Sequence, residues 1–317
     1  MIKNPQISII IPVYNREDLL ATTLDSIISQ TFSEWECILV DDHSTDESYS
    51  LMEIYEKKDS RFKIFKRPVN SRKGANSCRN FGFGKSFGFT IKWFDSDDIM
   101  LENHLQVAYD VLVKNNLDFV VTDTINFNDK TNEFLGRPYD FDRKNEDITS
   151  ENLARNRLGW ITDDFLGKRQ IVEKIKFNEN ITDGDEYNFF IKMLQNPLKG
   201  AFVNEIVTHR RIHAGAISSL NRADKINYLL ILANLKYHTA LDLVFYGNKE
   251  LIRWFLSGYM RILFELALLG KDEPSKNGAS SLIRRYFSFD KFVAFVAASY
   301  LGLYFKKGYN IMKYART

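Results

Sequence analysis

Three aspartates crowd into four positions, at Asp95, Asp97 and Asp98, directly after the apolar stretch "FTIKWF". Like charges this close repel one another and cost stability unless a positive charge lies among them. The simplest interpretation of such a run is a solvated acidic turn. The alternative is a site for a divalent cation, because hard cations such as Mg²⁺ and Mn²⁺ prefer carboxylate oxygens as ligands.

Two further polar clusters follow apolar segments in the same way. Tyr14 and Asn15 end the segment "ISIIIPVYN", and Asp41 with Asp42 ends "WECILVDD". Apolar side chains at helical spacing separate these segments, which predicts alternating strands and helices. Such alternation is typical of an α/β fold with a mostly parallel central sheet flanked by helices. Because these sheets bind ligands at the carboxyl ends of their strands, we expect the three clusters to share one site.

The composition is that of an ordinary globular chain. Of the 317 residues, 44% are hydrophobic and 26% are charged, and the net charge of +2 gives no indication of nucleic-acid binding. The two cysteines, Cys37 and Cys78, form neither a disulfide framework nor a metal-ligand spacing. We find no signal-peptide pattern and no apolar run of the roughly 20 residues that a spanning helix needs. These features predict a cytoplasmic protein.

The last part of the chain, from about Asn221, has a helical pattern throughout. From Lys271 onward, nine Lys and Arg residues stand against three Asp and Glu residues, among many aromatic side chains. A basic, aromatic-rich amphipathic segment is typical of a helix that lies on a membrane surface. An ordinary helical extension packed on the preceding domain fits equally well. The first interpretation predicts a peripheral protein on the inner face of the cytoplasmic membrane.

Five segments together resemble the family-2 glycosyltransferases, which are inverting enzymes of the GT-A (Rossmann-like) fold that use nucleotide sugars. They occur in the family's order over roughly residues 5–220: "SIIIPVYNRED", "CILVDDHSTDES", "RNFGFGKSFGFTIKWFDSDD", "FNENITDGDEYNFFIKM" and "RRIHAGAISS". The resemblance, to the bacterial cell-surface polysaccharide type, implies a nucleotide-sugar-binding half (1–98) and an acceptor-binding, catalytic half (99–220) of one domain. A helical extension (221–317) would follow.

The resemblance implies a donor site at the strand ends. Tyr14 and Asn15 would line the pocket for the base and ribose, and Asp41 would accept a hydrogen bond from the base. The full set of residues implied to bind the nucleotide sugar is Pro12, Tyr14, Asn15, Asp41, Arg79, Asp95, Asp97 and Arg211.

A divalent cation, Mn²⁺ or Mg²⁺, is also implied, at the Asp-x-Asp element. It would neutralise the diphosphate leaving group and act as a Lewis acid. Asp97 and Asp98 are both candidate ligands, and the sequence does not choose between them. His213 is a third candidate because a neutral imidazole can bind a metal, although a lone histidine is more often structural.

Inversion needs a carboxylate that removes the proton of the acceptor hydroxyl. The family's acidic pair after a glycine matches Gly184-Asp185-Glu186, with the second acid as the base. That match favours Glu186, but the family residue is normally an aspartate, so Asp185 stays open. A helix amino terminus also favours acids through its dipole, with no catalytic role. Trp160 and Asp163 lie in the region that shapes the acceptor site in such enzymes.

We therefore expect an inverting, metal-dependent hexosyltransferase. It would move a sugar from a nucleotide-diphosphate donor, a UDP-sugar foremost, to a hydroxyl of a glycan or lipid-linked glycan. Two alternatives remain at this point. The unusual order Asp185-Glu186 leaves room for a catalytically inactive sugar-nucleotide-binding or scaffold protein. A sugar nucleotidyltransferase would usually carry a glycine- and lysine-rich loop after its first strand, where this chain has "PVYNRED".

Overall fold

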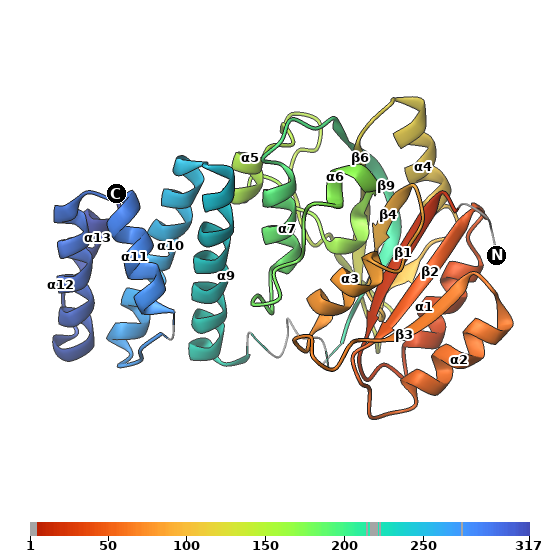
Figure 1. The fold of residues 1–317 in the computed structure, drawn as a ribbon, viewed down its shortest axis with the longest axis horizontal. Helices are drawn as coiled ribbons and strands as arrows, with labels where there is room; N and C mark the ends of the chain where they lie inside the picture. The colour runs from red at the N-terminus through yellow and green to blue at the C-terminus, as the bar shows by residue number, and fades with distance from the viewer. Residues whose placement is uncertain (1–4, 214, 216–220, 222, 274) are drawn as a thin grey trace. The chain divides into compact units, whose positions relative to one another are not determined.

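The computed structural model describes residues 5–213, 215, 221, 223–273 and 275–317. The chain divides into two compact units, one of Met1–Glu179 with Phe189–His213 and one of Asn180–Asn188 with Ala214–Thr317. The first unit contains the β-sheet, and the second contains the helices that follow it in the chain (Figure 1). The division of the sheet-containing part into a donor half and an acceptor half stays a prediction.

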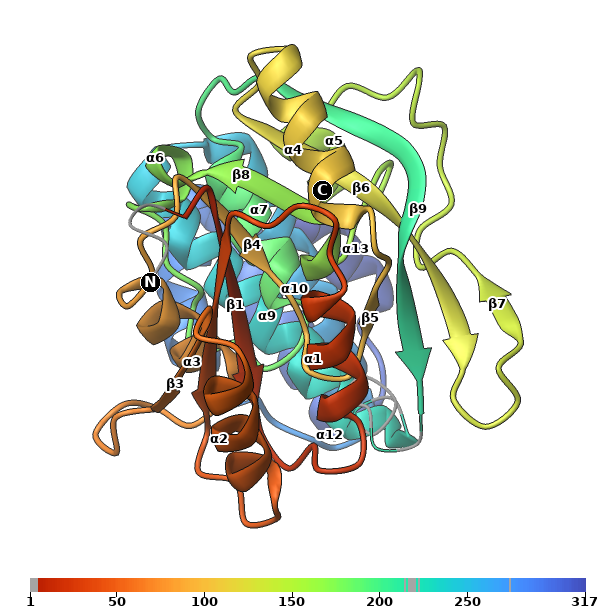
Figure 2. The same ribbon diagram turned by 90° about the vertical axis from the view of Figure 1, so that its right-hand side faces the viewer.

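Nine strands within the described residues form one sheet in the first unit, in the order β3-β2-β1-β4-β8-β6-β9-β5, with β7 paired to β6 (Figure 2). Six strands run in one direction, and β5, β7 and β8 run against them. The predicted α/β fold with a mostly parallel sheet is thereby confirmed. The strands are β1 Ile7–Val13, β2 Trp35–Asp41, β3 Phe62–Lys66, β4 Thr90–Trp93, β5 Ile99–Met100, β6 Phe119–Asn128, β7 Phe134–Gly136, β8 Phe165–Lys168 and β9 Gly200–Ile212.

Helices cover both faces of this sheet, which explains why β1 and β2 are continuously apolar. Ile9 and Ile11 pack with Leu24 of α1 in the main core cluster. Ile10 points to the other face, where α3 lies so close that a Cβ on Gly82 would meet Ile10 Cγ2 at 2.7 Å. The helices of this part are α1 Leu20–Ile28, α2 Ser48–Lys58, α3 Ala75–Phe83, α4 His104–Lys114, α5 Ser150–Ala154, η1 Thr162–Asp164 and α6 Arg169–Val172. Helix α7, Asp185–Met193, is divided between the two units, with residues 185–188 in the second.

The parallel register brings three loops to one edge of the sheet. Val13 of β1 pairs with Asp41 of β2, and Ile10 of β1 pairs with Trp93 of β4. The segments after these strands therefore leave the sheet on the same side. Strand β8 lies antiparallel between β4 and β6, so η1, which precedes β8, also arrives at this edge.

The second unit is helical, as the sequence predicts. Asp224 and Asn248 cap α9 and α10 by accepting hydrogen bonds from backbone N–H groups, and Gly247 ends α9 in a left-handed conformation (φ 72°). Among the helices that the structure describes, none is both long and apolar enough to cross a membrane. The helices are α9 Lys225–Tyr246, α10 Lys249–Leu268, α11 Lys276–Tyr286, α12 Phe289–Phe305 and α13 Tyr309–Arg316.

Candidate active site

Three carboxylates converge at the carboxyl edge of the sheet. Asp95 and Asp98 follow β4, whereas Asp163 comes from η1, far along the chain. One oxygen of each lies within 4.8 Å of the others, and Asp163 Oδ1 accepts a hydrogen bond from the backbone N–H of Asp95 at 3.0 Å. Asp98 and Asp163 are buried, and the Asp95 side chain is 41% exposed. We refer to Asp95, Asp98 and Asp163 as the acid cluster.

The electrostatics of the acid cluster fit a divalent cation. Burial, with the charges of Asp95 and Asp98, raises the pKa of Asp163 well above its ordinary value. Burial, with the charge of Asp97, raises the pKa of Asp98 to about 8. Asp163 Oδ2 is buried and accepts no hydrogen bond from a described N–H or hydroxyl group, and the Asp98 carboxyl group is the neighbour with which Asp163 can share a proton. An unsatisfied buried oxygen among like charges is unfavourable, and a cation would supply the missing positive charge.

These pKa values predict how stability depends on pH. An unfolded aspartate has a pKa near 3.9, so the folded chain holds more protons between about pH 4 and pH 8. This contribution to stability is complete below about pH 4 and is lost as pH rises toward 8, by up to about 1.4 kcal/mol per pH unit and proton. In EDTA, we expect the urea concentration at the unfolding midpoint to be lower at pH 8 than at about pH 6. Added Mn²⁺ should raise this midpoint, and the increase should be largest at pH 8. Equal slopes for the parent and Asp98→Asn would contradict this.

Asp97 has different partners from those of its neighbours. Its Oδ2 lies 3.1 Å from both Arg16 Nε and His213 Nε2. Burial opposes its ionisation, but the hydrogen bond from His213 and the charge of Arg16 lower the pKa of Asp97 below its ordinary value. Arg16 was not among the predicted site residues; it lies inside the segment "PVYNRED" and donates a hydrogen bond to Asp97. The metal roles of Asp97 and His213 stay predictions.

Arg211 holds the acidic loop against β9. Its backbone N–H donates to Asp98 Oδ1 at 2.7 Å, and its Nε donates to the backbone oxygen of Asp97 at 2.9 Å. Its guanidinium also pairs with Asp129. Arg211 therefore fixes the orientation of Asp98, and contact with a pyrophosphate stays a prediction. Ser218 and Ser219 of the closing basic motif lie outside the described residues.

The loops after β1 and β2 bind each other where a nucleotide is predicted to lie. Asn15, with φ 48°, donates its backbone N–H to Ser44 Oγ and accepts a hydrogen bond from the Thr45 N–H at 2.8 Å. Asp41 is buried and accepts hydrogen bonds from the Ser44 N–H. Tyr14 is 39% exposed. The three residues lie together, and their contacts with a base and ribose stay predictions, as does that of Pro12.

Arg79 of α3 supplies positive charge to the acid cluster. It donates to Asp95 Oδ1 at 2.7 Å, and its side chain is only 6% exposed. The amino end of α3 is held by Asp42, which pairs with Arg67 and accepts a hydrogen bond from the Gly74 N–H at 2.9 Å. Arg79 therefore lies close to the predicted donor site, beside one of its three carboxylates.

A buried cation behind the acid cluster was missed by the sequence analysis. Lys92 of β4 is fully buried, donates to the backbone oxygen of Asp163 and lies 2.6 Å from His104 Nε2. Burial lowers the pKa of Lys92 to about 8 and that of His104 well below its ordinary value. A lysine inside the apolar strand "TIKW" was the available signal. Its positive charge stabilises the ionised carboxylates in front of it.

The residues predicted to meet the acceptor have different surroundings. Trp160 is 2% exposed, and its ring packs on Phe190 and Phe202. A sugar could stack on it only after these side chains move. Asp163 belongs to the acid cluster. Asp185 and Glu186 open α7 after Gly184, which has φ 75°, and they are half-buried in the second unit. Their catalytic role stays a prediction.

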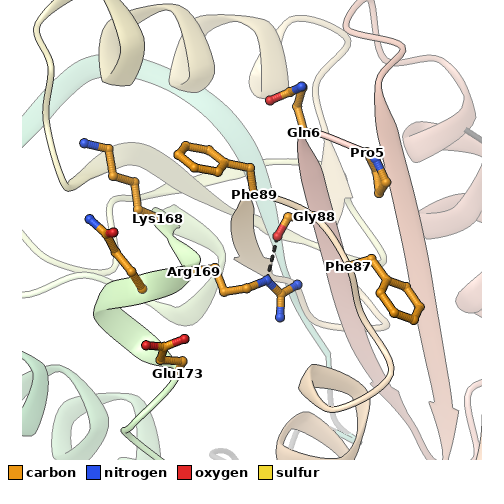
Figure 3. Close-up of a pocket in the computed structure, with 9 residues that line it drawn as sticks. Pro5, Gln6, Phe87, Gly88, Phe89, Lys168, Arg169 and Glu173 are labelled. Carbon is orange, nitrogen blue, oxygen red and sulfur yellow. Dashed lines mark hydrogen bonds between the residues drawn. The ribbon is translucent and has the colours of Figure 1, made fainter. Parts of the chain in front are cut away.

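A separate cavity of about 490 Å³ lies where β1 and β4 begin, at the opposite edge of the sheet (Figure 3). Arg169 lines this cavity and donates a hydrogen bond to the backbone oxygen of Gly88 at 2.7 Å. No residue of the predicted site lines it, so the candidate active site is the acidic edge. The lining residues are Pro5, Gln6, Phe87, Gly88, Phe89, Lys168, Arg169, Gln170 and Glu173.

An α/β sheet with an acid cluster at the carboxyl ends of its strands is the arrangement expected of an enzyme that handles a nucleotide sugar. Residues 8–176 match the sequence model of the family described as Glycosyl transferase family 2. The chain belongs to this family and is a glycosyltransferase.

Two relatives illustrate the range of the family. The chain is 33% identical over 217 residues to the UDP-Glc:alpha-D-GlcNAc-diphosphoundecaprenol beta-1,3-glucosyltransferase WfgD of Escherichia coli. That alignment covers 67% of this chain and 79% of WfgD. It is 27% identical over 213 residues to an uncharacterized glycosyltransferase of Rickettsia bellii. That alignment covers 65% of this chain but only 29% of the relative, so the chain spans less than a third of that protein.

A solved structure shares the fold. The S. aureus TarS fragment 1-349, in complex with UDP-GlcNAc, superposes with a TM-score of 0.66 over 94% of this chain and 89% of that one. Sequence identity is 15%, so the likeness shows the fold alone, which is the GT-A fold with carboxyl-terminal helices.

Proposed function

We propose that this glycosyltransferase is metal-dependent and inverting, and that it transfers a sugar from a UDP-sugar to a hydroxyl of a lipid-linked glycan. The observation that carries the proposal is the acid cluster, with the unsatisfied Asp163 oxygen at the carboxyl edge of the sheet. The name of WfgD supports a UDP-sugar donor and a diphosphoundecaprenol acceptor, and the UDP-GlcNAc in the TarS complex supports the same base.

Asp98 and Asp163 would hold the cation, with Asp95 as the third member of the acid cluster. Asp97 and His213, which contact each other, would be further candidate ligands. The cation, Mn²⁺ or Mg²⁺, would supply Lewis-acid stabilisation of the departing diphosphate. Arg211 orients Asp98, and Arg79 neutralises Asp95. Tyr14, Asn15 and Asp41 would bind the nucleoside at the loops after β1 and β2.

Glu186 would act as the general base, with Asp185 as the alternative. The acceptor hydroxyl must lose its proton as its oxygen bonds to the anomeric carbon, and a carboxylate can take that proton. Trp160 would help to shape the acceptor site. A lipid-linked acceptor would bring the enzyme to the inner face of the cytoplasmic membrane as a peripheral protein, in contact through its carboxyl-terminal helices.

Thermal-shift titration tests the donor site directly. We expect UDP with Mn²⁺ to raise the melting temperature, because a ligand at one hundred times its Kd stabilises by about 2.7 kcal/mol. GDP, CDP and dTDP should shift it less, and UDP without Mn²⁺ should have little effect. If UDP shifts the protein equally in EDTA, the metal part of the proposal is wrong. If no nucleotide shifts it under any condition, the proposed nucleotide-sugar donor site is wrong.

A further inference from the structure

Helix α12 presents a row of large apolar side chains to solvent. Positions 289, 293, 296, 300 and 304 follow helical spacing and lie on one face. We call this row the aromatic face: Phe289, 71% exposed, Val293, 48%, Val296, 48%, Tyr300, 57%, and Tyr304, 63%. The opposite side of the helix is buried, with Gly302 packed close to Phe264 of α10. In Figure 1, α12 lies at the end of the row of helices of the second unit, farthest from α9.

The aromatic face carries no charge of its own. Within residues 289–305, all of which the structure describes, the charged side chains are Asp290 and Lys291. Tyr314 of α13 donates its hydroxyl to the Asp290 carboxylate, and Lys291 is half-buried away from the face. At 1.5 Å per residue the face is roughly 22 Å long. Soluble proteins seldom leave so continuous an apolar surface in water, so a partner is expected to cover it.

The charges around the aromatic face indicate the chemistry of that partner. From Ser288 to the end of the chain, five basic residues stand against one acid, Asp290. Lys307 follows the end of α12 and Lys313 lies on α13, and both are exposed, whereas Lys306 donates to the backbone oxygens of Ala267 and Leu303. A second copy of this chain would bring the same basic flank, and its single acid is already bound to Tyr314. Anionic headgroups complement this flank, whereas a second copy does not.

We propose that the aromatic face lies in the headgroup region of an anionic phospholipid bilayer, with Lys307 and Lys313 supplying the positive charge for lipid phosphates. Tyrosine suits this layer because its ring is apolar and its hydroxyl can reach water, and phenylalanine adds apolar surface. The helix would lie along the surface, in keeping with the absence of a spanning helix among those described. The inference deepens the proposed function, because a lipid-linked acceptor is held at the same surface.

Vesicle flotation tests the aromatic face. The full chain should float with vesicles of phosphatidylcholine and phosphatidylglycerol, and less with phosphatidylcholine alone or in high salt. Val296→Glu with Tyr300→Glu should reduce the bound fraction at least about tenfold, because two carboxylates would enter the headgroup layer. Phe245→Glu is the matched control, since Phe245 of α9 is 89% exposed and lies outside the face. Lys307→Gln with Lys313→Gln should remove most of the preference for the anionic lipid.

Three results would overturn the inference. The first is a parent protein that does not float, and the second is a double glutamate variant that floats as well as the parent. The third is a parent that sediments as a dimer which the glutamate pair dissociates, because a second copy would then cover the face. The UDP and Mn²⁺ thermal shift, measured on every variant, separates this inference from the proposed function. An unchanged shift with lost flotation supports the membrane surface, whereas a missing shift in the parent refutes the donor site alone.

Discussion

Glu186→Gln should lower kcat by about 10²- to 10⁴-fold, the usual contribution of a general base. Glutamine keeps the size of glutamate but cannot accept the proton of an acceptor hydroxyl. Donor binding should be unaffected, so the UDP and Mn²⁺ thermal shift should match that of the parent. The measurement is the initial rate with a UDP-sugar and a lipid-linked acceptor, reported as kcat and KM separately.

Asp185→Asn is the matched control for this substitution. Both acids lie in the first turn of α7. Removing either charge loses a favourable interaction with the helix dipole, worth about 0.3–1 kcal/mol of stability. A change in the melting temperature common to both variants therefore reports that structural effect. A rate loss confined to Asp185→Asn would make Asp185 the base, and parental rates in both would remove the base from this turn.

Asp98→Asn and Asp163→Asn should each lower activity by at least about 100-fold, because the cation loses a charged ligand worth several kcal/mol in the transition state. In metal-free protein the same substitutions should leave stability unchanged or raise it, most at pH 8, since each replaces a carboxyl group that is costly to ionise in a cluster of like charges. Isothermal titration with Mn²⁺ should show the weakened binding. This combination separates a metal ligand from a structural carboxylate, whose loss lowers stability.

Asp110→Asn controls for the loss of one negative charge. Asp110 is an exposed residue of α4 that accepts a hydrogen bond from Gln106. It should keep parental activity and Mn²⁺ affinity. If Asp163→Asn binds Mn²⁺ as tightly as the parent, the buried oxygen of Asp163 is not a metal ligand and the site must be assigned to Asp97, Asp98 and His213.

The edge of the sheet at which the site lies could be predicted from the sequence. Apolar runs ending in polar residues define parallel strands, and parallel strands place Tyr14, Asp41 and Asp95 on one side. These relations depend on short stretches of chain whose periodicity is visible. The same reasoning predicted the helical nature of the last hundred residues, because their apolar spacing is regular.

The arrival of Asp163 could not be predicted in the same way. It depends on β8 entering the sheet between β4 and β6, a pairing between distant segments that leaves no local pattern. The ion pair of Arg16 with Asp97 depends on the same three-dimensional arrangement. Lys92 was visible as a charge in an apolar strand, but its partners His104 and the Asp163 backbone were not.

The insertion of β8 also has a consequence for the order of folding. Thr90 of β4 pairs with Lys168 of β8, so this part of the sheet closes only after a long intervening segment has been brought back. Contacts of such high sequence separation are costly in chain entropy and form late. A cation that needs both Asp98 and Asp163 would therefore recognise the completed sheet and not its earlier intermediates. Its binding would slow unfolding more than it accelerates folding.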